Sequence, residues 1–197
     1  KVFGLTMMFP ILSDQSATPS HDLQIRRYLA TLPTGPTSLF ALAPSTHMAR
    51  LVVMDDVIYV GTPACEEHLK SKYLVFEANS DVDIDEYAAG LARSVPGEVE
   101  AIWRHCAGYP GVADVSAFVK YAKACQVPTT FYFAAVNDKS LPETLKALQT
   151  KRAVAEFVAE HQDLPAQDLQ REFVAFMERL KVAATPVAGS GNDGWSR

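Results

Sequence analysis

The sequence predicts a single α+β domain of the ferredoxin-like βαββαβ class, with an antiparallel sheet and its main helices on one face. Two observations carry this prediction. Four stretches rich in apolar, aromatic or β-branched residues are typical of strands, and helical segments separate them in the order β-α-β-β-α-β. Extra helical segments precede the fourth strand and follow it. With 197 residues, 48% of them hydrophobic, the chain has enough apolar surface for one core.

The first strand is expected at Val2–Phe9, where both alternating sets of positions are apolar. A polar loop then leads to Ser20, a residue type that caps helices. Behind it, apolar residues recur at helical spacing, and the Pro-Gly-Pro stretch that begins at Pro33 ends the helix. These apolar residues are Leu23, Ile25, Leu29 and Leu32.

The second strand is expected at Thr46–Met54 and the third at Tyr73–Ala78, both rich in β-branched or aromatic residues. Between them, Val57–Val60 is expected to extend a hairpin.

Three helices are expected before the fourth strand. Asp83 caps the first, with Glu86 three residues later, and the same apolar spacing recurs after Pro96 and after Asp114. Pro128 then introduces the fourth strand, Thr129–Val136.

The C-terminal part is predicted to be helical. Ser140 and Glu143 have capping-box spacing and open a helix that runs to about His161, and a last helix follows Pro165. We expect one domain over residues 1–182 and a loose tail over 183–197.

Strands one, three and four are apolar on both faces, whereas the main helices of this fold cover only one. A second subunit, the C-terminal helices or a ligand cavity must therefore cover the other face. The favoured expectation is a homodimer that packs sheet against sheet.

Composition excludes several classes of protein. A net charge of -5 disfavours nucleic-acid binding, and no apolar run approaches the roughly 18 residues of a membrane span. Three unpaired cysteines indicate a reducing, cytoplasmic location. The five histidines show no metal-ligand spacing, so no metal site is predicted.

His47 and Arg50 are polar side chains within the otherwise apolar second strand, on opposite faces. His47 is a candidate general base or haem ligand, or a hydrogen-bonded core histidine. Arg50 either pairs with Glu77 across antiparallel strands or holds a carboxylate ligand.

A second cluster of candidates surrounds the end of the helix that follows Pro96. Trp103 and Tyr109 could form flat pocket walls, with His105 as a titratable group; helix termination explains the same residues without a pocket. The functional hypothesis is that His47 and His105 line one cavity.

Three short blocks carry a resemblance. Thr46-His-Met-Ala-Arg50, Tyr73 to Asp81 and Ala101 to Pro110 resemble blocks of a mostly bacterial family without an assigned reaction. That family is similar to the dimeric α+β barrel group, which includes dye-decolourising peroxidases, chlorite dismutases and cofactor-free monooxygenases. The peroxidase Gly-x-x-Asp-Gly hallmark is not met; the nearest string is Ser190–Gly194.

Together these observations predict a small-molecule-binding or oxidoreductase-type domain with an apolar pocket. His47, His105 and Arg50 are the candidate catalytic residues, and Trp103, Tyr109 and Glu77 the candidate substrate-binding residues. The cofactor stays open, with haem as the one named candidate. The alternative is a non-catalytic partner domain that assembles through the open sheet face.

Overall fold

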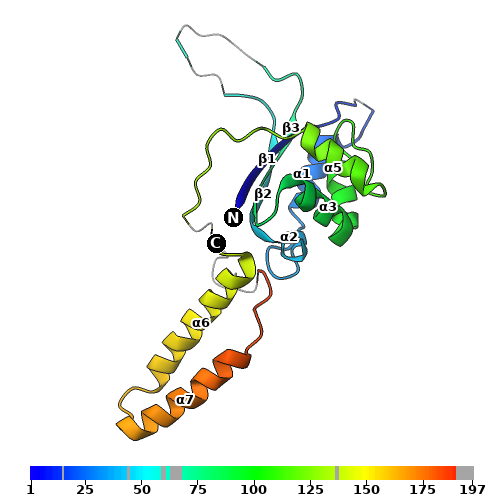
Figure 1. Ribbon diagram of the computed structural model, residues 1–197. Coiled ribbons are helices and arrows are strands. Elements are labelled where there is room, and N and C mark those ends of the chain that lie inside the picture. Colours follow the sequence, from blue (N-terminus) through cyan, green and yellow to red (C-terminus); the bar gives the residue numbers. More distant parts are fainter. Residues whose placement is uncertain (15, 44, 59–60, 63–67, 136–137, 190–197) are drawn as a thin grey trace.

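Three strands form one antiparallel sheet in the order β1-β3-β2: β1 is Phe3–Pro10, β2 is Thr46–Met54 and β3 is Tyr73–Ser80. Figure 1 shows the sheet in the computed structural model, which describes residues 1–14, 16–43, 45–58, 61–62, 68–135 and 138–189. Glu77 on the central strand pairs with Thr6 of β1 and with Arg50 of β2. The three N-terminal strands are thus confirmed, together with the β2–β3 hairpin.

One face of the sheet carries the core. Leu5, Met7 and Phe9 of β1 and Leu74 and Phe76 of β3 are almost fully buried there. Helices that pack on this side supply the rest of the core, and Figure 1 shows them together beside the sheet. They are α1 (His21–Leu29), the short α2 (Leu39–Leu42), α3 (Ile84–Ser94), α4 (Pro96–Trp103) and α5 (Val115–Ala124).

Helix starts follow the capping residues in the sequence. The Asp83 carboxylate accepts hydrogen bonds from the first backbone N–H groups of α3, and Asp114 does the same for α5. Ser140 and Glu143 form a complete capping box at the start of α6 (Leu141–Glu160). These predictions are confirmed, whereas α2 was not predicted, because its four residues are too few to show a helical period.

The predicted βαββαβ arrangement is wrong, because the described part of Thr129–Val136 forms no strand. The segment that follows α5 begins to pair with β1: Met8 N donates to Cys125 O at 2.8 Å, and Val127 N donates to Thr6 O at 2.9 Å. At Thr129 the side-chain hydroxyl, not the backbone nitrogen, reaches Gly4 O, at 3.4 Å. Beyond it Phe131 and Phe133 are exposed. The strand propensity of these residues alone does not make a strand, because their backbone forms no ladder of hydrogen bonds with β1.

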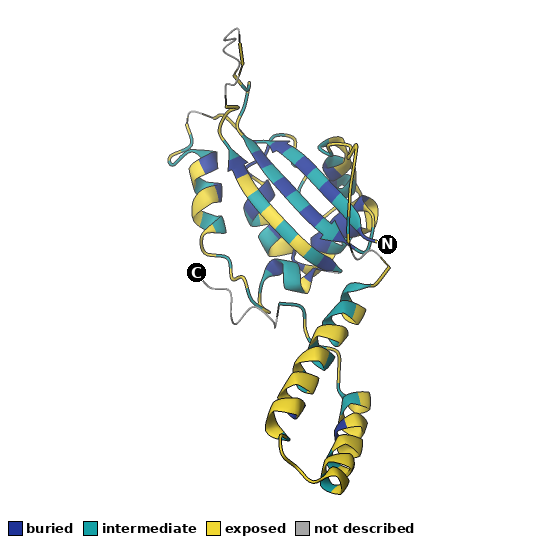
Figure 2. Cartoon of the chain, turned by 90° about the vertical axis from the view of Figure 1, so that its left-hand side faces the viewer, coloured by how far each residue is buried: buried dark blue, intermediate teal, exposed yellow. Residues whose placement is uncertain are grey.

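The fold is therefore an N-terminal three-stranded sheet followed by a mostly helical C-terminal half. Helices α6 and α7 (Ala166–Val182) form a hairpin that extends away from the sheet (Figures 1 and 2). They leave the sheet's second face uncovered, with Met48, Arg50 and Val52 exposed on β2. The C-terminal helices were one of three candidates expected to cover this face, and they do not cover it.

Some predictions reach residues outside the described ranges. Val57 and Ile58 lie in no strand, and the rest of Val57–Val60 falls outside, as do Cys65, Val136 and the string Ser190–Gly194. Within the described chain Cys106 and Cys125 are free thiols. No described helix is long and apolar enough to cross a membrane.

Candidate functional site

A β-bulge singles out His47 at the start of β2. Thr46 pairs with Ser80 and Met48 pairs with Asn79, so His47 is an extra residue with no partner of its own on β3. Such a bulge turns a side chain out of the regular alternation, and bulges recur next to functional sites. The local irregularity therefore gives His47 an orientation that neither face of the strand would supply.

The His47 side chain meets the carboxylate of Asp81, the residue that follows β3. His47 Nε2 lies 2.6 Å from Asp81 Oδ1, and both side chains are largely buried. The other carboxylate oxygen, Oδ2, accepts a hydrogen bond at 2.8 Å from the backbone N–H of Leu141, the first residue of α6. Asp81 thus connects the bulge with the start of the helical hairpin.

These contacts define the roles of the two imidazole nitrogens. An ionised carboxylate only accepts hydrogen bonds, so His47 Nε2 carries the proton that it donates to Asp81. In the neutral ring Nδ1 then keeps a free lone pair. A histidine oriented by a carboxylate in this way is suited to accept a proton or a hydrogen bond from a bound molecule.

A cavity of about 440 Å³ adjoins His47, between β2 and the segment that runs from the end of α1 to α2. This volume lies within the range of pockets for small molecules. Apolar side chains dominate its wall, and His47 is its one titratable residue. The lining residues are Leu29, Leu32, Pro33, Thr34, Gly35, Ser38, Leu39, Phe40, Ala41, Thr46, His47, Met48, Ala49, Leu51, Ala188 and Gly189.

The C-terminal segment closes one side of this cavity. Gly189 has a φ of +79°, and a Cβ at this position would lie 2.8 Å from the carbonyl oxygen of Gly35. A side chain therefore fits neither the backbone conformation nor the space. The described part of the expected tail, 183–189, thus returns from α7 to the cavity wall.

Arg50 and Glu77 pair with each other, as the antiparallel register predicts. Their side chains form an ion pair on the uncovered face of the sheet and are both substantially exposed. Arg50 is absent from the cavity lining beside His47. The predicted ion pair between Arg50 and Glu77 is confirmed.

Trp103 and Tyr109 belong to the aromatic core. Trp103 is 1% exposed and makes edge-to-face contacts with Phe9, Phe76 and Phe118. The Tyr109 hydroxyl donates to Glu100 Oε2 at 2.8 Å. Burial and this carboxylate raise the pKa of Tyr109. Neither residue lines the cavity beside His47.

His105 lies at the opposite end of the sheet from His47. Its backbone carbonyl accepts from Leu12 N, just beyond the last residue of β1, whereas His47 lies near the first. A strand of eight residues spans about 25 Å, so the structure does not bring the two histidines into one cavity.

His105 instead forms a pair with a second histidine, His21. Its Nδ1 lies 2.9 Å from His21 Nδ1, and Arg104 Nε donates to its Nε2 at 3.4 Å. Burial, followed by the charges of Arg104 and His21, lowers the pKa of His105. This pair was not predicted, because His21 and His105 are 84 residues apart.

The residues do not fit haem. Both ring nitrogens of His105 have neighbours, and Asp81 engages His47 Nε2, which leaves Nδ1 as the one nitrogen of these two histidines that could bind iron. Haem also carries two propionate carboxylates, and the cavity lining includes no Lys or Arg. Among the described residues no cluster of three or more His, Cys, Asp or Glu could hold a metal ion.

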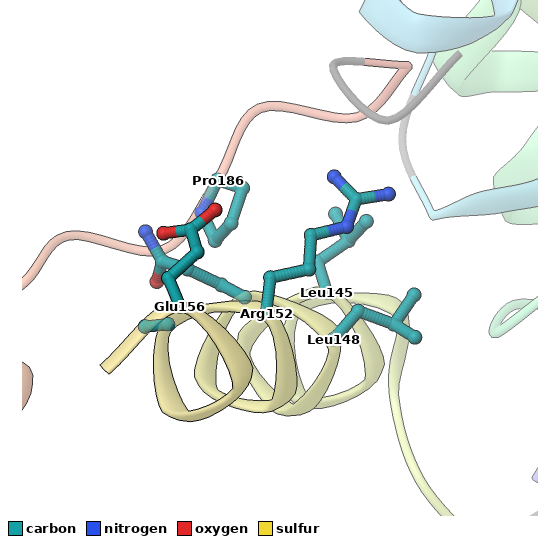
Figure 3. Close-up of a pocket in the computed structure, with 7 residues that line it drawn as sticks. Leu145, Leu148, Arg152, Glu156 and Pro186 are labelled. Atoms are coloured by element: carbon teal, nitrogen blue, oxygen red, sulfur yellow. The ribbon is translucent and has the colours of Figure 1, made fainter. Parts of the chain in front are cut away.

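A second hollow, of about 410 Å³, lies along α6 under Pro186. Figure 3 shows Leu145 and Leu148 at its base, with Arg152 and Glu156 beside Pro186. Its polar side chains, Gln149, Arg152 and Glu156, all come from α6, and the two charged ones are exposed.

Asp81 is the residue of this candidate site that sequence reasoning missed. The run from Asp81 to Glu86 looked like helix-capping residues, and Asp83 indeed caps α3. The usable signal was register, because antiparallel pairing of the two predicted strands brings the residue after Ser80 next to Ser45 and His47. Comparison with protein-family models, curated proteins and solved structures gives no match, so the chemistry of this cavity rests on its own residues.

Proposed function

We propose that this protein binds a small, largely apolar molecule with one hydroxyl group in the cavity beside His47. The observation that carries the proposal is the hydrogen-bonded His47–Asp81 pair, whose histidine is the one titratable residue among the described residues in the wall of this mostly apolar cavity. Pockets of this kind bind through apolar contact and orient their ligand through few polar groups.

The hydroxyl group of the proposed ligand is inferred from the position of the proton on the His47 ring. With Nε2–H directed at Asp81, the neutral imidazole offers its Nδ1 lone pair, which accepts a hydrogen bond. A phenol or another acidic alcohol supplies the matching donor, and Asp81 stabilises the imidazolium that forms if the proton transfers. His47 is therefore proposed as the anchoring and proton-accepting residue.

Two probes of nearly equal shape test the proposal. p-Cresol and toluene share the aromatic ring and methyl group, but only p-cresol has a hydroxyl. Titration of isotope-labelled protein with each probe, followed by NMR, reports binding at the His47 ring and at the methyl groups of Leu32 and Leu51. We expect p-cresol to bind more tightly, and His47→Ala to weaken p-cresol at least about fivefold while leaving toluene unchanged.

Cavity filling provides the matched control. Leu32→Trp places a large ring in the cavity and should abolish binding of both probes, whereas Leu42→Trp changes an exposed residue outside the lining and should abolish neither. Absence of binding of either probe to the unmodified protein contradicts the proposal. Equal affinity for both probes with and without His47 contradicts the role of its lone pair.

A further inference from the structure

We infer that the α6–α7 hairpin is an interface on which a second copy of this chain packs to form a four-helix bundle. The first observation is how little the hairpin buries by itself. Helix α6 has 20 residues and α7 has 17, yet only Phe157 in the first and Phe176 in the second are buried. Figure 2 shows exposed residues along most of both helices, with intermediate residues between them.

Few internal contacts hold the two helices together. The Phe157 ring stacks on Phe176 with centroids 4.6 Å apart and meets Phe173 at 5.9 Å. Helices of this length gain most of their stability from packing of an apolar face. Within a single chain, one aromatic cluster between two otherwise exposed helices provides little of this apolar packing.

Five of the exposed apolar residues gather on one side of the hairpin, whereas Leu148 of α6 and Val182 of α7 lie on other sides. Val154 and Val158 lie about 60° and 100° around α6 from Phe157, counted towards increasing residue number at about 100° per residue. On α7, Met177 and Val174 lie about 40° and 100° from Phe173 in the same sense. Because the helices run in opposite directions and face each other through these rings, both rotations lead to the same side (Figure 1).

This apolar face, made of Val154, Val158, Phe173, Val174 and Met177, is open to solvent. Its five side chains are between 38% and 57% exposed. On the other side of α6, Pro186 of the returning C-terminal segment lies against the helix (Figure 3). The chain thus covers one side of the hairpin itself and leaves the apolar face free.

Charge and size both favour a second copy as the occupant. Charges of both signs flank the face, Glu143 and Lys151 on α6 and Glu178 and Lys181 on α7, and each helix is electrically neutral in sum. A face depleted of charge is typical of an interface core, and it offers no complement to a strongly charged partner.

The dimensions agree with a small dimer. Helices of about 30 Å and about 25 Å, packed about 10 Å apart, present a flat footprint of roughly 500 Å², in which residues 154–158 and 173–177 supply the apolar part. Projecting side chains enlarge this area towards the roughly 800 Å² that each partner of a stable complex buries. Two hairpins that join apolar faces give a four-helix bundle, the smallest arrangement that encloses such faces.

Sedimentation equilibrium of the full chain tests the inference. We expect a species of twice the 21.5 kDa chain mass, and Val174→Glu with Met177→Glu should raise the dissociation constant at least about tenfold. Met48→Glu, an exposed apolar residue on the open sheet face, is the matched control and should leave it unchanged.

Hydrogen exchange of the unmodified chain gives a second readout that needs no variant. Amide protection in α6 and α7 should rise with protein concentration across the dimer transition, while protection in β1 and β3 stays constant. A monomer at all concentrations overturns the inference. So does a dimer that Met48→Glu dissociates and the α7 variant does not, since the sheet face would then be the interface.

Discussion

His47 on β2 and Asp81 after β3 form a side-chain pair at 2.6 Å, although 34 residues separate them in the chain. The pair lies where three parts of the molecule meet: the bulge in β2, the cavity wall and the first turn of α6. Asp81 uses one oxygen for His47 and the other for Leu141 N. The site is therefore coupled to the helical hairpin through a single carboxylate.

Replacement of Asp81 by Ala should lower the free energy of unfolding by about 1–3 kcal/mol, because it leaves two largely buried N–H donors without an acceptor. Urea denaturation measures this loss. Amide exchange at Leu141 should accelerate as well, because its N–H loses the acceptor that holds the first turn of α6.

The control for that experiment is Asp85→Ala. Asp85 forms an exposed ion pair with Lys123 at 2.8 Å, and such pairs contribute less than about 1 kcal/mol. If the two variants unfold at the same urea concentration and Leu141 exchanges as in the unmodified protein, the pair with His47 does not contribute as its geometry implies.

Arg50 and Glu77 should contribute little to stability and nothing to binding in the cavity. The Arg50 side chain is largely exposed and that of Glu77 partly exposed, so a double-mutant cycle of Arg50→Ala and Glu77→Ala should give a coupling energy below about 1 kcal/mol. The p-cresol affinity of Arg50→Ala should equal that of the unmodified protein. A several-fold loss would restore the hypothesis that Arg50 holds a ligand.

The Tyr132 ring should make substitution of Gly4 by a larger residue unfavourable. A Cβ on Gly4 would lie 2.5 Å from the Tyr132 ring, so Gly4→Ala displaces that ring from β1. We expect thermal unfolding to show a small destabilisation by Gly4→Ala that disappears when Tyr132→Ala is also present. Equal destabilisation in both backgrounds would show that the ring does not lie over this strand.

Local features of the sequence predicted the parts of the fold that depend on neighbours in the chain. Runs of apolar, aromatic or β-branched residues located β1, β2 and β3, the capping residues Asp83 and Ser140 located two helix starts, and apolar residues at helical spacing located the helix after Asp114. The Arg50–Glu77 pair followed from antiparallel register. What failed was the fourth strand, because its pairing depended on whether Thr129 would donate its backbone or its hydroxyl to Gly4.

The candidate site was predictable in part for the same reason. His47 was identified because a polar residue within an apolar strand needs a partner. The identity of that partner, and the separation of His47 from His105 at opposite ends of the sheet, depend on long-range placement that periodicity does not encode. The relationship to the dimeric α+β barrel group and the cytoplasmic location stay predictions.

The His21–His105 pair should make the protein less stable in mild acid. Because Arg104 Nε donates to His105 Nε2, Nδ1 of His105 carries the proton directed at His21, and the buried ring is held neutral. Its pKa is lowered in the folded state, so below about pH 6.5 the unfolded chain binds more protons than the folded one. Stability is then fully present above that pH and falls as the pH drops towards the lowered folded pKa.

Urea denaturation between about pH 7.5 and about pH 5.5 measures this effect. The unmodified protein should lose stability over the interval, and His105→Gln, which cannot be protonated, should lose distinctly less. His68→Gln is the control, because His68 is exposed and hydrogen-bonded to Asp56. The free energy of unfolding of this variant should fall with pH as steeply as that of the unmodified protein. Parallel slopes in His105→Gln and the unmodified protein would mean that another group governs the acid response.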